Sequence, residues 1–98
     1  MINAVVLIEA DRDVMSELGG MLADVPGVAE AYSVTGEWDF ACIVRVPRHE
    51  QLADVISGTI GSMPGVTRTQ TLVAFEVFSK HDLEALFDVG NTAPEPGA

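Results

Sequence analysis

The sequence contains a single cysteine, Cys42, only five basic residues, and no apolar stretch long enough to cross a membrane, which takes about 18 residues. One cysteine excludes an internal disulfide, and its apolar neighbours indicate a reduced, buried thiol. The five bases stand against 15 acids, and a net charge of -10 repels phosphate backbones, so we expect no direct binding to nucleic acid. No signal peptide is visible, so we expect a cytosolic protein without a membrane partner.

Patterns that indicate catalysis or metal binding are missing as well. His49, His81 and Cys42 do not have the spacing of metal ligands, and the serines lack the context of a nucleophile. Glu37 and Asp39 stand two apart on a turn with no histidine nearby, and spacing alone cannot make them an acid/base pair. We therefore expect no catalytic residue, no metal, no cofactor and no enzymatic activity.

Apolar residues, in contrast, are abundant. They make up 48% of the 98 residues, and the mean hydropathy is +0.29. A single domain of this length buries only about 60–65% of the surface that its unfolded chain exposes. Large exposed apolar patches are uncommon on monomers, so we expect part of the apolar surface to lie between subunits.

Apolar periodicity and turn signals predict strands and helices in the order βαββαβ. The first and third strands are apolar on both faces, which is typical of strands that are covered on both sides. Asp11 is the expected N-cap of the first helix. We expect residues 1–80 to form the domain and residues 81–98 a short C-terminal helix with a mobile tail. The predicted strands span 2–10, 28–35, 38–46 and 66–78, and the predicted helices span 11–25 and 48–63.

An internal repeat supports this order. Val25-Pro26-Gly27-Val28 recurs 38 positions later as Met63-Pro64-Gly65-Val66, and each copy ends a helix and starts a strand. Two βαβ halves of this kind form a ferredoxin-like α+β fold, a four-stranded antiparallel sheet with both helices on one face. The predicted strand order is 4-1-3-2. The uncovered face is still apolar, so we predict that two subunits pack sheet against sheet.

The turn between the second and third strands has the most unusual composition in the chain. Gly36-Glu37-Trp38-Asp39 places two carboxylates and the only tryptophan beside one glycine. An amino-acid ligand needs an acceptor for its ammonium group, which Asp39 can supply, and donors for its carboxylate, which backbone N–H groups at a glycine turn can supply. Trp38 offers an apolar wall. The alternative is that Asp39 only caps its own turn.

This turn resembles a family signature. Val34 to Phe40 reads Val-Thr-Gly-Glu-Trp-Asp-Phe, which is similar to the Thr-Gly, acid, aromatic, Asp signature of the Lrp/AsnC effector domain, also called the RAM domain. The similarity covers about residues 2–79, including Tyr32, the two Pro-Gly-Val motifs and Thr69-Gln70-Thr71. In full-length members a DNA-binding helix-turn-helix precedes this domain. Here the first strand starts at Ile2, so the chain resembles the stand-alone RAM proteins.

The resemblance implies a ferredoxin-like fold that dimerises through its sheets. It also implies that dimers assemble into rings, commonly octamers or decamers, and bind amino acids in clefts between neighbouring dimers. Family members commonly have Asp-Tyr where this chain has Glu37-Trp38, which enlarges the aromatic side chain and removes a hydroxyl. The implied ligand-binding residues are Thr35, Gly36, Glu37, Trp38 and Asp39 in the effector loop, with Thr69 and Thr71 on the fourth strand.

Several functions remain open at this point. The leading one is a non-enzymatic amino-acid sensor that oligomerises and modulates a full-length regulator of the same family. The second is an interaction module without a ligand, and the third is an enzyme of the dimeric α+β barrel type, for which only Trp38 is available. An ACT-type amino-acid-binding domain shares the fold, but its glycine-rich site follows the first strand, where this chain has residues 9–12.

Overall fold

The computed structural model describes residues 1–80, so the helix and tail expected over 81–98 lie outside the described residues. The helical segments include one π-helical segment, η2, and two 3₁₀ turns, η1 and η3. The elements in chain order are β1 (Ile2–Ala10), η1 (Arg12–Val14), α1 (Met15–Ala23), β2 (Val28–Ser33), β3 (Phe40–Val46), α2 (His49–Ala53), η2 (Asp54–Thr59), η3 (Ile60–Ser62) and β4 (Val66–Val73).

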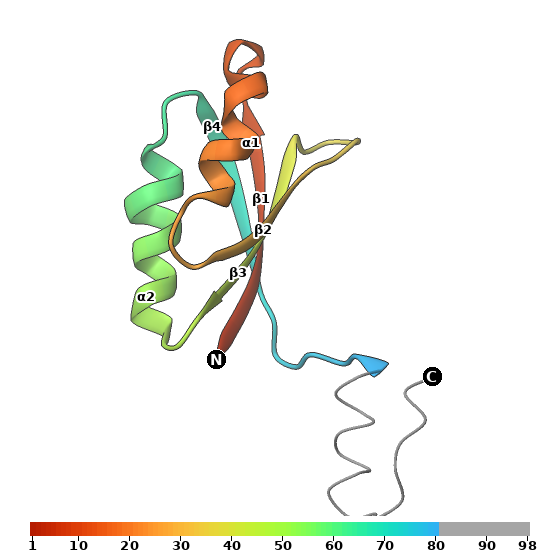
Figure 1. The fold of residues 1–98 in the computed structure, drawn as a ribbon, viewed down its shortest axis with the longest axis vertical. Helices are drawn as coiled ribbons and strands as arrows, with labels where there is room; N and C mark the ends of the chain where they lie inside the picture. The colour runs from red at the N-terminus through yellow and green to blue at the C-terminus, as the bar shows by residue number, and fades with distance from the viewer. Residues whose placement is uncertain (81–98) are drawn as a thin grey trace, which may run out of the picture.

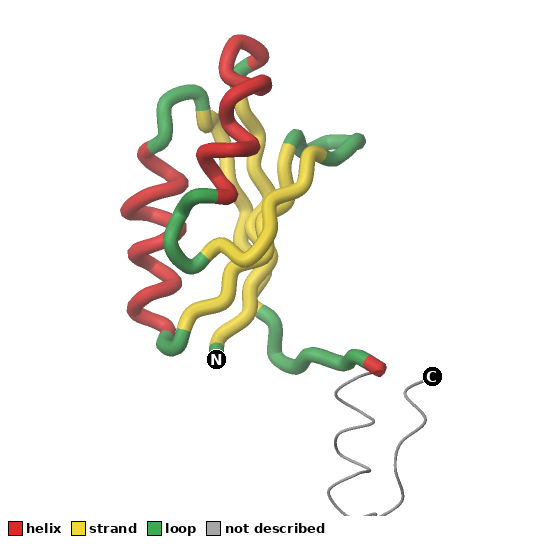
Figure 2. Tube along the Cα trace, in the orientation of Figure 1, coloured by secondary structure: helices red, strands yellow, loops and turns green. Residues whose placement is uncertain are grey.

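The four strands form one antiparallel sheet in the order β2-β3-β1-β4. The helical segments lie together on one side of this sheet, and the strands form a second layer (Figures 1 and 2). This arrangement confirms the ferredoxin-like α+β fold and the predicted order, since 4-1-3-2 is the same series read from the other edge. None of the helices within residues 1–80 is long and apolar enough to cross a membrane.

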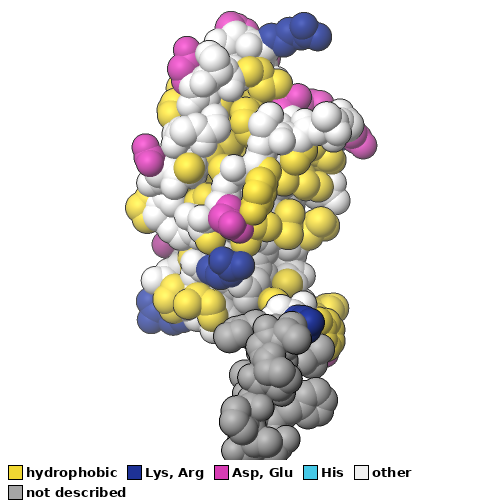
Figure 3. Space-filling model, turned by 45° about the vertical axis from the view of Figure 1, so that its right-hand side comes forward, with side chains coloured by type: hydrophobic (Ala, Val, Ile, Leu, Met, Phe, Trp, Pro, Cys, Tyr) yellow, Lys and Arg dark blue, Asp and Glu magenta, His cyan; other side chains and the backbone are white. Residues whose placement is uncertain are grey.

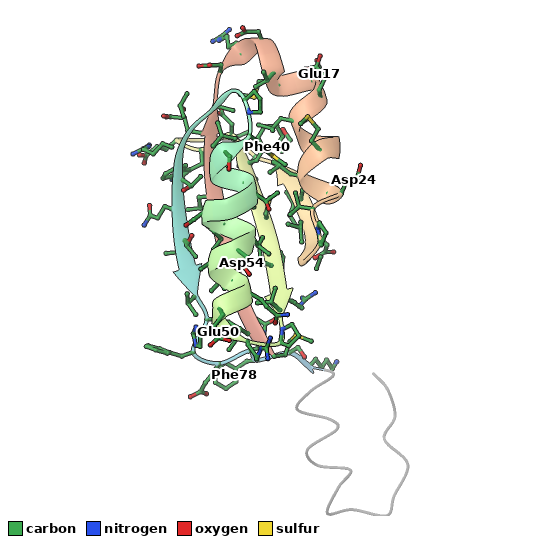
Figure 4. The ribbon with its side chains drawn as sticks, turned by 90° about the vertical axis from the view of Figure 1, so that its left-hand side faces the viewer. Glu17, Asp24, Phe40, Glu50, Asp54 and Phe78 are labelled. Carbon is green, nitrogen blue, oxygen red and sulfur yellow. The ribbon has the colours of Figure 1, made fainter. Side chains whose placement is uncertain are left out.

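The core lies between the helices and the inner face of the sheet. Alternate residues of β1, Ala4, Val6 and Ile8, are buried there because successive strand residues point to opposite faces. Phe40 of β3 lies between the helices and the sheet (Figure 4). Cys42 is buried, as its apolar neighbours predicted. Burial raises the pKa of its thiol to about 11, so the thiol is protonated at neutral pH.

The outer face of the sheet has no helix of residues 1–80 over it. We call this surface the open face. Residues paired across antiparallel strands share a face, so Val5 with Ile43 and Leu7 with Ala41 form its apolar centre. Tyr32 and Leu72 extend it to both edge strands, and each is 48% exposed. Figure 3 shows apolar side chains gathered on this side of the molecule.

Three strand ends differ from the prediction. β2 ends at Ser33, two residues early, and β3 begins at Phe40, two residues late, so the connection between them is longer than a tight turn. β4 ends at Val73 instead of residue 78, and the chain leaves the sheet there although β1 continues to Ile2. Val73 is already opposite Ala4, and Ala74 N–H makes the last bond, 2.8 Å to the carbonyl oxygen of residue 3.

The helices differ in detail from the prediction. Asp11 has the extended backbone of an N-cap, but its side chain makes no capping hydrogen bond. Its backbone N–H donates instead to the Gly65 carbonyl oxygen at 2.8 Å, which ties the start of the first helical segment to the loop before β4. The predicted helix over 48–63 is three consecutive segments, α2, η2 and η3. Gly58 and Gly61 lie in this stretch and lower its helix propensity.

Two glycines with positive φ angles provide a matched test of the loops. Gly65 has φ +92° and a Cβ there would overlap the Val14 side chain, whereas Gly36 has φ +107° and nothing within 4 Å. Alanine at either position costs about 1–2 kcal/mol of backbone strain, and overpacking at Gly65 adds about 1–3 kcal/mol. We therefore expect Gly65→Ala to lower the free energy of unfolding in urea more than Gly36→Ala does. Equal losses would contradict the close packing of Gly65 on Val14.

Candidate functional site

The connection between β2 and β3 is anchored to the end of β1. Val34 N–H donates to the Asp39 carbonyl oxygen at 3.0 Å, which closes the connection, and Asp39 N–H donates to the Ile8 carbonyl oxygen at 2.9 Å. Gly36 lies at the exposed tip with a positive φ, as its place in the turn requires. The connection projects from the sheet on the side away from the helices (Figure 1).

Asp39 binds the backbone of another strand rather than its own turn. Its Oδ2 accepts a hydrogen bond of 2.9 Å from Ala10 N–H, beside the register shift of the β1–β4 ladder at Glu9 and Ala10. The expected alternative, an Asp39 side chain that caps its own turn, is therefore not what the structure contains. Within residues 1–80 the Oδ1 atom of this half-buried carboxylate accepts no hydrogen bond, so it can still bind a ligand.

Glu37 and Trp38 are held by Arg68 of β4. The Arg68 Nη2 atom lies 3.0 Å from Glu37 Oε2 and 3.6 Å from Glu9 Oε2. The Arg68 guanidinium carbon lies 4.2 Å from the centre of the Trp38 ring, in the range of a cation–π contact. Arg68 was missed by the sequence analysis. The only available signal was the opposite charges of Glu9 and Arg68, which the β1–β4 register places across from each other.

The remaining predicted residues are not gathered at this point. Thr69 pairs with Ile8 and Thr71 with Val6, which places both threonines on the face that the helices cover. Arg68 is on the opposite face by strand alternation. Thr35 is exposed at the tip of the connection next to Gly36. A single chain therefore does not bring the fourth-strand threonines to Glu37 and Trp38.

An open hollow of about 790 Å³ lies beside Asp39, where β1 ends and the first helical segment begins. Three carboxylates and one guanidinium line it, so its potential favours a ligand that carries an ammonium group. Thr67 donates to the Glu9 carbonyl oxygen at 3.0 Å and closes one side. The lining residues are Glu9, Ala10, Asp11, Arg12, Met15, Asp39 and Thr67, of which the sequence analysis had assigned only Asp39 to the site.

Metal binding gains no support from the described part of the chain. Within residues 1–80 there is no group of three histidine, cysteine, aspartate or glutamate side chains placed to hold an ion. The residues that line the hollow offer charge recognition and hydrogen bonding. Its acceptors are carboxylate oxygens, and its cation is the Arg12 guanidinium.

Comparison with known proteins identifies relatives with the same domain. The family model described as the Lrp/AsnC ligand binding domain matches residues 3–83. An uncharacterized HTH-type transcriptional regulator of Pyrococcus furiosus is 35% identical over 76 residues, which cover 74% of this chain and 51% of that protein. The chain thus spans about half the length of the curated relatives it matches.

Solved structures give the same result. The crystal structure of TTHA0845 from Thermus thermophilus is 44% identical with a TM-score of 0.77, and the match covers 82% of this chain and 100% of that one. A transcriptional regulator of Neisseria meningitidis, solved as a complex with L-Met, has a TM-score of 0.72 at 16% identity, over 80% of this chain and 52% of that one. The second likeness concerns the fold alone.

The contact between Arg68 and Trp38 can be tested by fluorescence, because Trp38 is the only tryptophan. We expect Arg68→Ala to uncover the indole ring and to raise its acrylamide quenching constant, with Arg68→Lys intermediate. The free energy of unfolding should change by less than about 1 kcal/mol, since the ion pairs are exposed. Arg48→Ala, which removes an exposed arginine paired with Glu50 on another part of the surface, is the control. If the quenching constants of Arg68→Ala and Arg68→Lys equal that of the unchanged chain, as that of the control should, the contact between Arg68 and Trp38 is contradicted.

Proposed function

Because this chain belongs to the Lrp/AsnC ligand-binding domain family, we propose that it is a regulatory module that binds a small amino-acid effector. The family comprises transcription regulators, and its matching domain is the part described as ligand-binding. We further propose that the module is not an enzyme, that it is cytosolic, and that it acts through a full-length regulator of the same family. An effector regulates such a module only if it binds one state more tightly than another.

The observation that carries the proposal is the position of Asp39. One of its carboxylate oxygens is fixed by Ala10 N–H at 2.9 Å, and the other faces no donor within residues 1–80. This bond orients the carboxylate at the edge of the hollow that Glu9, Asp11 and Arg12 also line. An ammonium group bound at Asp39 would place the ligand's carboxylate within the same hollow, where the Arg12 guanidinium is the available cation.

Glu37, Trp38 and Arg68 form the second part of the proposed site. The Trp38 ring is half-buried, with the guanidinium of Arg68 over it, and the Arg68 side chain is itself 48% exposed. Because Arg68 covers one side of the Trp38 ring, the apolar side chain of a ligand can contact only the parts of the ring that Arg68 leaves uncovered. Thr35 and Gly36 belong to the same connection as Glu37 and stay in the proposal with it. Thr69 and Thr71 stay in the proposal as residues that would contact the ligand only in the further assembly of dimers, since they do not lie on the open face. The Neisseria meningitidis regulator, whose domain shares this fold, was solved with L-Met, and an amino acid is the ligand class that we propose here.

Association of subunits through the open face is part of the proposal. Glu17, Asp24, Glu50 and Asp54 point outward from the helical layer (Figure 4), and like charges there disfavour packing of one helical layer on another. The open face carries an apolar centre instead, which favours contact with its own copy. We propose that dimers formed in this way assemble further into octamers or decamers.

Calorimetric titration with the twenty amino acids, each at millimolar concentration, tests the ligand. We expect heat from at least one of them, and we expect Asp39→Asn to weaken that binding by about tenfold or more, since a charged hydrogen bond is worth about 1.5–3 kcal/mol. Asparagine keeps an oxygen for Ala10 N–H, so this variant removes the charge and not the anchor.

Asp13→Asn is the control, because Asp13 is an exposed acid of η1 that does not line the hollow. It should bind the ligand as the unchanged chain does. Silence for all twenty amino acids would favour the ligand-free interaction module. Equal binding by Asp39→Asn and the unchanged chain would remove Asp39 as the ammonium partner.

The proposed dimer is tested by a charge at the centre of the open face. We expect Leu7→Lys to dissociate the dimer in sedimentation velocity at micromolar concentration, because a lysine ammonium would be buried between two apolar sheets. Met21→Lys is the control, since Met21 is a 45% exposed apolar residue on α1. A monomeric unchanged chain would overturn the association, and a dimeric Leu7→Lys variant would move the interface away from this face.

A further inference from the structure

The segment after β4, residues 74–78, is an apolar arm with no partner strand among residues 1–80. It reads Ala-Phe-Glu-Val-Phe, a composition with high strand propensity. Phe75 is fully exposed, and Phe78 and Val77 are 75% and 55% exposed. The arm turns away from the body on the side of the open face (Figures 1 and 2). The packing of residues 1–80 does not explain two exposed phenylalanines.

The arm and the β2–β3 connection lie on opposite ends of the same side of the molecule. Figure 1 shows both projecting from the sheet away from the helices, the connection at one end of the strands and the arm at the other. The open face lies between these two projections. A second copy that docks on the open face therefore meets the arm at one margin. The arm is continuous with this face through Leu72, which is exposed on it.

The sheet alone offers a face of limited area. Four strands spaced about 4.8 Å apart and about seven residues long give a face of roughly 20 by 23 Å. A stable specific interface buries about 800 Å² of accessible surface on each partner, so a flat face of roughly 450 Å² in plane leaves room for side chains at its margin to contribute. Phenylalanine side chains bury about 150–250 Å² each, so Phe75 and Phe78 can supply area at that margin.

The charges of the two surfaces are compatible. Glu76 is the only charged residue of the arm. On the open face Arg45 donates through Nε to Asn3 at 3.1 Å and, within residues 1–80, has no carboxylate within ion-pair distance. Asn3 and Arg45 lie at the end of the sheet from which the arm departs. An arm that lies across the same end of a second copy brings Glu76 toward an unpaired cation.

We propose that residues 74–78 form an exchanged arm that packs on the open face of a second copy of this chain, with Phe75 and Phe78 as its apolar anchors. The inference rests on the association through the open face proposed above. It goes further by assigning a segment outside the sheet to the contact. It also explains why a sequence with strand propensity up to residue 78 leaves its own sheet at Val73.

The double variant Phe75→Asp/Phe78→Asp tests the arm in the full chain. We expect the dissociation constant of the dimer, measured by sedimentation velocity over a dilution series, to rise at least tenfold. Met21→Asp is the control, since it places one carboxylate of the same kind at an exposed apolar residue of the helical layer and should leave the constant unchanged. Far-UV circular dichroism of each variant reports whether the fold is kept.

The outcomes separate this inference from the proposed association. If the double variant has the same dimer dissociation constant as the unchanged chain, the proposed role of the arm is wrong and the proposed open-face dimer is unaffected. A monomeric unchanged chain overturns the association itself.

A photo-crosslinker at residue 75 identifies the surface that the arm touches. Benzoylphenylalanine in place of Phe75, in a mixture of ¹⁴N- and ¹⁵N-labelled chains, should give crosslinks between isotopes to β1 or β3 peptides of the open face. Crosslinks only within one isotope, or only to the acidic helical layer, would overturn the proposal. Because this readout does not depend on the affinity of a variant, it stands even if the double variant fails to fold.

Discussion

The constraint on which this structure depends is that two short helical stretches can cover only one face of a four-stranded sheet. Both crossovers lie on the same side, so the inner face of β1 and β3 is fully buried and the outer face is not. A chain of 98 residues has no further described element to place there. Its apolar residues therefore also occur on the outer face, and burial of that face against a second surface would be favourable in water, which is the basis of the association proposed above.

The fold was readable from the sequence because its signals are local and repeated. The two Pro-Gly-Val motifs, at residues 26–28 and 64–66, predicted both helix-to-strand turns. The apolar runs of β1 and β3 predicted the two central strands. The end of β4 could not be read in this way. The residues after Val73 have good strand propensity, but a strand exists only where it pairs with a neighbour, and within residues 1–80 no strand pairs with residues 75–78.

The site was only partly predictable, for a related reason. The turn composition singled out Glu37, Trp38 and Asp39, and these residues do make the side-chain contacts of the connection. Their partners come from elsewhere in the chain. Ala10 N–H reaches Asp39 because the ladder shifts register beside it, and Arg68 reaches Trp38 because β4 pairs with β1. Such pairings depend on register, which no local pattern in residues 34–40 encodes.

Glu9 connects the two surfaces that the proposed function requires. Its carboxylate lies 3.6 Å from Arg68, on the side of the open face, and the same residue lines the hollow beside Asp39. Under the proposed function, a ligand ammonium group in the hollow would compete with Arg68 for this carboxylate, while Glu37 at 3.0 Å would keep Arg68 beside the Trp38 ring. If subunits associate through the open face as proposed, a ligand that shifts this ion-pair network would bind the assembled and separate states with different affinities. Effector binding and assembly would then be coupled, and each would change the other by the same factor.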